Sequence, residues 1–145
     1  MKAFSNITLA VSGIALFYLS TMRLIDPSAA TFLKTYLADA ENVLTTEMAS
    51  EFRGAGAGMV LAGITAFFAI FVPRLKVAAF FVLSVLFAGV VLGRSVSWVV
   101  DGVPDASFVM VLTHEAMFAV ANLFCLAAIL VNDRTTTPEL SARAN

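Results

Sequence analysis

Residues 77–100 read VAAFFVLSVLFAGVVLGRSVSWVV, an apolar run in which Arg94 is the only charged side chain. A helix of about 20 such residues, at about 1.5 Å rise each, crosses the hydrocarbon core of a bilayer. Three further runs of similar length and character lie at residues 4–22, 52–72 and 108–131. The sequence therefore predicts an all-α integral membrane protein with four spans.

The composition excludes most other classes of protein. Apolar residues make up 60% of the 145 residues and charged residues only 13%, against about a quarter charged in soluble domains. A soluble enzyme of this size could not bury so much apolar side chain. An intrinsically disordered chain is excluded as well, because a sequence with 13 Phe and few charged residues is too apolar to remain solvated. The net charge of −1 gives no sign of a nucleic-acid partner, and the single cysteine excludes an internal disulfide or a cysteine zinc site.

Proline and glycine mark the connections between the spans. Pro27 follows the first span, Pro73 forces a tight turn between the second and third, and Asp-Gly-Val-Pro at 101–104 is typical of a turn before the fourth. The segment that ends at Ser50 is the only long loop, and its apolar residues at helical spacing predict a short interfacial helix. The expected architecture is an up-down-up-down four-helix bundle.

Basic residues are distributed unevenly between the two ends of this bundle. One end holds Lys2, Arg74, Lys76, Arg134 and Arg143, whereas the other holds Arg23 and Lys34. By the positive-inside rule both termini are cytoplasmic and the long loop is outside. We expect a four-span domain over 1–131 and a polar, mobile cytoplasmic tail over 132–145. The first span also resembles a signal peptide, but it is nearly full length, so we expect it to be an uncleaved helix.

Small residues predict where the helices touch. Gly54 and Gly58 in the second span, and Gly89 and Gly93 in the third, have the four-residue spacing that lets helices approach closely in lipid. We interpret all four as helix-packing positions. The preferred contact lies within one bundle, and the alternative is a contact between copies in a homo-oligomer.

Charged residues inside the spans are costly and therefore informative. Arg94 lies about 9 Å inside the third span and Glu115 about 10 Å inside the fourth, counted at helical rise. At matching depths on antiparallel neighbours, the two side chains are expected to form an ion pair. With the nearby charges, the predicted polar cluster comprises Glu51, Arg53, Arg94, Asp101 and Glu115. Such a cluster is either a structural latch or a site that binds a ligand or handles protons.

His114 and Asn122 are the remaining candidate ligand contacts in the fourth span. His114 is the only histidine, so the chain alone cannot supply a two-histidine haem site or a three-histidine zinc site. Met110 and Met117 share a face with His114, but methionines at helical spacing are more often packing residues than copper ligands. Asn122 is expected to hydrogen-bond across the bundle. We predict no catalytic residue, no metal site and no cofactor, since the motifs of phosphate loops and hydrolases are missing from the sequence.

Several of these motifs occur together in one known family. Glu51-Phe52-Arg53-Gly54, Gly93-Arg94, the turn at 101–104 and Glu115 resemble the small four-helix bacterial membrane family called domain of unknown function 4345. The resemblance covers most of the chain, from the first span to the fourth. It implies a four-span fold in a bacterial inner membrane, singles out Arg53, Arg94, Asp101 and Glu115, and implies no activity. His114 has no counterpart in the pattern.

Three functions are compatible with these features. The preferred one is a non-enzymatic accessory or scaffold subunit of a membrane complex, because the chain is small and has no catalytic motif. The alternative is a binder or carrier of a small lipophilic or anionic ligand at the Arg/Glu cluster. The third is a membrane enzyme or redox protein that uses His114 and Glu115. The expected partners are membrane lipid and either a membrane protein complex or a second copy of the chain, with no nucleic acid.

Overall fold

The structure is a computed structural model that describes residues 2–27, 45–104 and 106–143. Within these ranges all the regular structure is helical, and four helices are long and apolar enough to cross a membrane. They are α1 (Lys2–Ile25), α3 (Thr46–Phe71), α4 (Lys76–Asp101) and α5 (Ala106–Arg143). The predicted all-α fold with four spans is confirmed, and the chain is a small multi-pass membrane protein.

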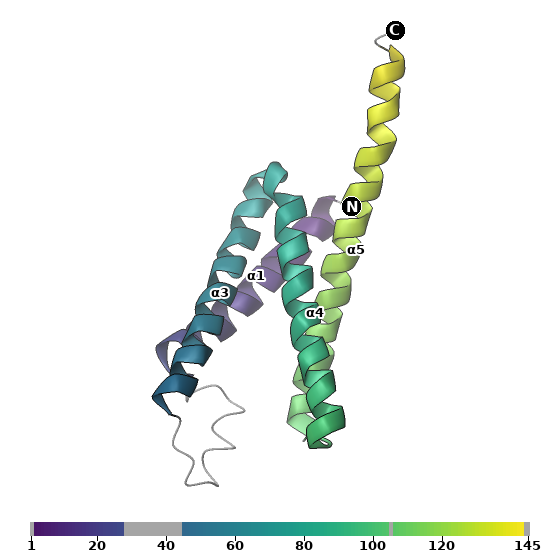
Figure 1. Ribbon diagram of the computed structural model, residues 1–145. Helices are drawn as coiled ribbons and strands as arrows, with labels where there is room; N and C mark the ends of the chain where they lie inside the picture. The colour runs from purple at the N-terminus through teal and green to yellow at the C-terminus, as the bar shows by residue number, and fades with distance from the viewer. Residues whose placement is uncertain (1, 28–44, 105, 144–145) are drawn as a thin grey trace.

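Successive helices run in opposite directions, as Figure 1 shows. α3 and α4 are joined by one turn of 3₁₀ helix, η2 (Pro73–Leu75). Pro73 is tolerated because it is the first residue of this turn, where a backbone N–H is not needed. α4 ends at Gly102, whose φ of +109° is a conformation that a side chain would strain. The start of α1 and η2 lie at one end of the bundle, and the α4–α5 turn lies at the other (Figure 1). We call these the η2 end and the turn end.

The four helices associate as two hairpins. α1 packs along α3, and α4 packs along α5, with fewer contacts between α3 and α4 or between α1 and α5. Figure 1 shows α3 and α4 diverging from their shared turn. In the α4–α5 hairpin the contact is aromatic, with the rings of Phe87 and Phe118 stacked at 5.0 Å between centroids. The bundle therefore consists of two closely packed helix pairs, α1–α3 and α4–α5. We call the interface between these two hairpins the seam.

Glycine sets the distance between α1 and α3. A Cβ placed on Gly63 would lie 3.0 Å from the carbonyl oxygen of Gly13 and 3.1 Å from the backbone nitrogen of Phe17. One on Gly56 would lie 3.1 Å from the carbonyl oxygen of Ser20. Gly56 and Gly63 are seven residues apart, so they lie on one face of α3. On this face the two backbones are so close that an added Cβ would push them apart by a few tenths of an ångström.

The four glycines predicted as packing positions do not make these contacts. A Cβ on Gly54, Gly58, Gly89 or Gly93 would have nothing within 4 Å. The prediction is wrong for contacts within one chain. In α3 the reason is the rotation of the helix. Gly54 and Gly58 are each two residues from Gly56, and two residues correspond to about 200° around the helix axis, so both glycines point away from α1. In α4 the large side chain of Phe87 makes the contact with α5, by stacking on Phe118.

Polar side chains join the two hairpins along the seam. The buried Asn122 amide of α5 donates to Ser12 Oγ of α1 at 3.0 Å, as expected of a bond across the bundle. Lys76 Nζ of α4 donates to Asn6 Oδ1 of α1 at 2.5 Å. Side-chain hydrogen bonds of this kind stabilise the association of helices in lipid, because the hydrophobic effect does not drive apolar helix surfaces together there.

The chain beyond the spans differs in part from expectation. α5 continues as a helix to Arg143, beyond the predicted end of the fourth span at residue 131. The mobile cytoplasmic tail over 132–145 stays a prediction. The predicted interfacial helix of the long loop falls outside the described residues. The orientation of the termini across the membrane stays a prediction.

Candidate functional site

Arg94 of α4 and Glu115 of α5 form a two-point ion pair. Arg94 Nε lies 2.7 Å from Glu115 Oε2, and Arg94 Nη2 donates to Glu115 Oε1 at 3.1 Å. Only 12% and 17% of the two side chains are exposed. One hydrogen bond, from Nη2, and one close ionic contact, at Nε, therefore join the two side chains. The ion pair predicted from the depths of Arg94 and Glu115 within their membrane spans is therefore present in the structure.

Two more groups surround the pair. The Arg94 guanidinium carbon lies 4.4 Å from the centroid of the Phe108 ring, a cation–π contact. Arg23 of α1 is close enough to interact electrostatically with both Arg94 and Glu115. Its Nη1 also donates to the thioether sulfur of Met59 at 3.8 Å, which is a weak hydrogen bond. The charges therefore form a group of three, Arg23, Arg94 and Glu115, with Arg23 supplied by the other hairpin.

A cavity of about 290 Å³ lies beside this group, and we call it the central cavity. All four helices line it. Its walls are mainly apolar and include Leu16, Leu86, Val90, Val111 and Phe118. Its polar lining consists of Ser20, Arg23, His114 and Glu115. An apolar cavity with a few convergent polar groups is the common form of a small-molecule site.

His114 reaches the cavity from the residue before Glu115. Its Nδ1 lies 2.7 Å from the carbonyl oxygen of Met110, and since a carbonyl only accepts, Nδ1 must carry the proton. In the neutral ring the proton-free nitrogen is then Nε2. The described residues contain no group of three His, Cys, Asp or Glu side chains placed to hold a metal ion.

The other predicted cluster residues lie apart from the ion pair. Glu51, Arg53 and Asp101 are exposed. Asp101 accepts from Ser97 Oγ within its own helix, and the start of α3 diverges from α4 (Figure 1). The five-residue cluster is therefore not assembled, because the backbone geometry at the turn end carries Glu51 and Arg53 away from the pair. Asn122 is not among the residues that line the cavity, since its amide is used on Ser12 and on the carbonyl of Phe118.

Sequence reasoning missed Arg23, which it assigned to the outer loop. α1 continues to Ile25, so Arg23 still belongs to the helix. The helix buries Ser12, Leu16 and Ser20 at four-residue spacing, and Arg23 extends this face by a further turn. That periodicity was the signal that could have placed Arg23 at the cavity.

Comparison with known proteins identifies the family of the chain. No curated protein and no solved structure matches the chain. One family model does match, over residues 4–126, which covers most of each of the four membrane helices. The chain therefore belongs to the family described as Domain of unknown function (DUF4345).

Proposed function

We propose that this membrane protein binds a small lipophilic molecule in the central cavity. The observation that carries the proposal is the cavity itself, because apolar walls from four helices meet one polar corner formed by Arg23, His114 and Glu115. A volume of about 290 Å³ suits a compact ligand, near the lower end of the usual range of about 300–1,000 Å³ for small-molecule sites.

The polar corner determines which ligand chemistry fits. Arginine has five N–H donors, so Arg23 can bind a ligand oxygen in addition to its protein contacts. Glu115 and the proton-free nitrogen of His114 are acceptors. The ligand is therefore an apolar molecule with a carbonyl, carboxyl or hydroxyl group at one end. Arg94 acts as a positioning residue, since its hydrogen bond and its close ionic contact hold the Glu115 carboxylate beside the cavity.

A matched pair of alanine substitutions tests this proposal. Ala15 lines the cavity, whereas Ala78 is exposed on the outside of α4. Ala15→Leu adds bulk inside the cavity, and Ala78→Leu adds the same bulk where lipid can move aside. Native mass spectrometry of protein purified in mild detergent, followed by extraction, measures the bound molecule. We expect the Ala15→Leu variant to lose it and the Ala78→Leu variant to retain it.

Two results would contradict ligand binding. One is equal occupancy in both variants, which would place the bound molecule elsewhere. The other is wild-type protein with no bound molecule, both in detergent and in nanodiscs made from the native membrane. Neither result depends on knowing the identity of the ligand beforehand.

A second candidate function is that of an accessory or scaffold subunit of a membrane complex. The observation favouring it is the open space at Gly54, Gly58, Gly89 and Gly93, two pairs with the spacing that admits a neighbouring helix. Crosslinking in the native membrane tests it, with Gly58→Leu and Gly89→Leu as variants. Loss of a crosslinked partner in these variants supports the role, and an unchanged crosslinking pattern opposes it.

We also propose that the protein lies in a bacterial inner membrane with both termini cytoplasmic. This proposal rests on the uneven distribution of basic residues between the two ends of the bundle.

A further inference from the structure

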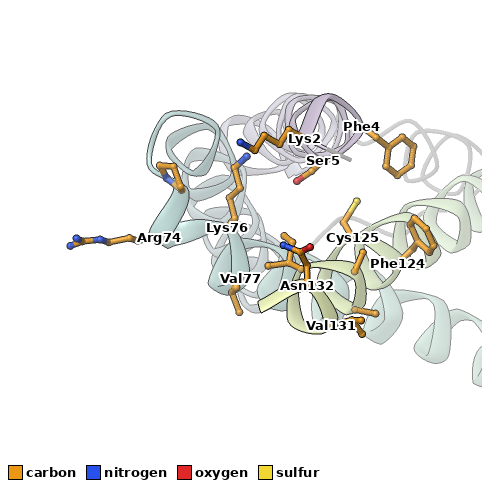
Figure 2. Close-up of a pocket in the computed structure, with 14 residues that line it drawn as sticks. Lys2, Phe4, Ser5, Arg74, Lys76, Val77, Phe124, Cys125, Val131 and Asn132 are labelled. Atoms are coloured by element: carbon orange, nitrogen blue, oxygen red, sulfur yellow. The ribbon is translucent and has the colours of Figure 1, made fainter. Parts of the chain in front are cut away.

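A second and larger cavity lies at the η2 end, away from the central cavity. Its volume is about 1,210 Å³, and we call it the basic pocket. The start of α1, the η2 turn with the start of α4, and the second half of α5 enclose it (Figure 2). Its charged lining residues are Lys2, Arg74 and Lys76, and the lining residues that the structure describes include no Asp or Glu.

The two lysines face the same part of the basic pocket. Figure 2 shows the ammonium ends of Lys2 and Lys76 directed toward each other, from α1 and α4, while the guanidinium of Arg74 turns away. Lys76 Nζ is held in place by its hydrogen bond to Asn6 Oδ1 at 2.5 Å. Two positive groups brought together beside apolar surface attract an anion, which lowers their mutual repulsion.

The rest of the pocket offers apolar wall and one unused polar group. Val77, Phe124, Ile129 and other apolar residues line it. The Ser5 side chain lines it too (Figure 2); the residue is only 9% exposed, and its hydroxyl has no hydrogen-bond partner in the described part of the chain. A buried hydroxyl without a partner is unfavourable, and a ligand oxygen would satisfy it.

We propose that the basic pocket binds one anionic phospholipid. The phosphodiester lies between Lys2 and Lys76, Ser5 donates to a glycerol or ester oxygen, and an acyl chain follows the apolar wall of α5. Three features favour a lipid over a free phosphate. The pocket lies at the end of the spans, where lipid head groups are found; its walls are apolar; and its volume far exceeds that of a phosphate. Basic pockets between membrane helices recognise anionic head groups in this way.

Binding of two lipids with identical acyl chains tests the proposal. Native mass spectrometry in mild detergent compares phosphatidylglycerol with phosphatidylcholine. We expect about a 30-fold preference for phosphatidylglycerol, from two lysine contacts of about 1 kcal/mol each. Lys2→Gln and Lys76→Gln should each reduce the preference about fivefold. Arg53→Gln removes the same charge from the turn end and should leave the preference unchanged.

Further variants and probes keep the result decisive. Lys2 is exposed, so Lys2→Gln remains informative if Lys76→Gln fails to fold for loss of its bond to Asn6. Lys2→Arg keeps the charge and should keep the preference. Equal binding of the two lipids by the wild-type protein would overturn the proposal. So would inorganic phosphate that binds as tightly as phosphatidylglycerol, because the pocket would then be an anion site without a lipid.

Discussion

The close contact between α1 and α3 predicts how a single methyl group would affect stability. Gly63→Ala places a Cβ 3.0 Å from the Gly13 carbonyl oxygen and 3.1 Å from the Phe17 nitrogen. Both neighbours are backbone atoms of α1, so no side chain can rotate away. The two helices must instead separate by a few tenths of an ångström. Overpacking of this kind costs about 1–3 kcal/mol.

Gly58→Ala is the matched control, since a Cβ at this position meets nothing within 4 Å. Both changes replace glycine by alanine within α3, so the gain in helix propensity, about 0.5–1 kcal/mol, applies equally to both. The difference between the two free energies of unfolding therefore isolates the contact with α1. We expect Gly63→Ala to be less stable than Gly58→Ala by about 1–3 kcal/mol.

Reversible unfolding by SDS in mixed micelles measures this difference, with helix content followed by circular dichroism. Gly13→Ala extends the test, because its Cβ would lie 3.2 Å from the Gly63 carbonyl oxygen. One separation of the helices relieves both new contacts, so the Gly13→Ala/Gly63→Ala double variant should lose less than the sum of the single losses. Equal stability of the Gly58→Ala and Gly63→Ala proteins would refute the close contact.

Three other predictions concern the polar groups and the topology. Arg94→Gln and Glu115→Gln should each lower the free energy of unfolding by about 3–5 kcal/mol, because each leaves a buried charge without its partner. The double variant should recover part of this loss. Strictly additive losses would show that the two groups are not coupled. A double-mutant cycle with Asn122→Ala and Ser12→Ala should give a coupling energy of about 0.6 kcal/mol, typical of hydrogen bonds between membrane helices, and a value of zero would contradict the bond across the seam. Reporters inserted after Lys34 and joined after residue 145 should report opposite sides of the membrane, and the same side would contradict four spans.

The parts of the structure that sequence reasoning predicted are those that lipid constrains most directly. A charge within hydrocarbon must be neutralised at its own depth, so the positions of Arg94 and Glu115 along their spans were enough to pair them. Helix rotation is constrained less. Glycines occur on opposite faces of α3, and the face that contacts α1 depends on Gly13 and Phe17, which only the packed structure identifies. Arg23 was missed for a related reason, because hydropathy ends the span before the helix ends.

The division into two hairpins also bears on how the protein enters the membrane during synthesis. The N-terminal helices emerge first, and the contact of Gly13 with Gly63 lies wholly between them. Arg94 and Glu115 both belong to the second hairpin. That hairpin can therefore insert with its carboxylate and guanidinium paired to each other, so that neither charge has to lie alone in hydrocarbon. The Gly13–Gly63 contact and the Arg94–Glu115 pair thus each lie within one hairpin, so each half can form these contacts before it meets the other.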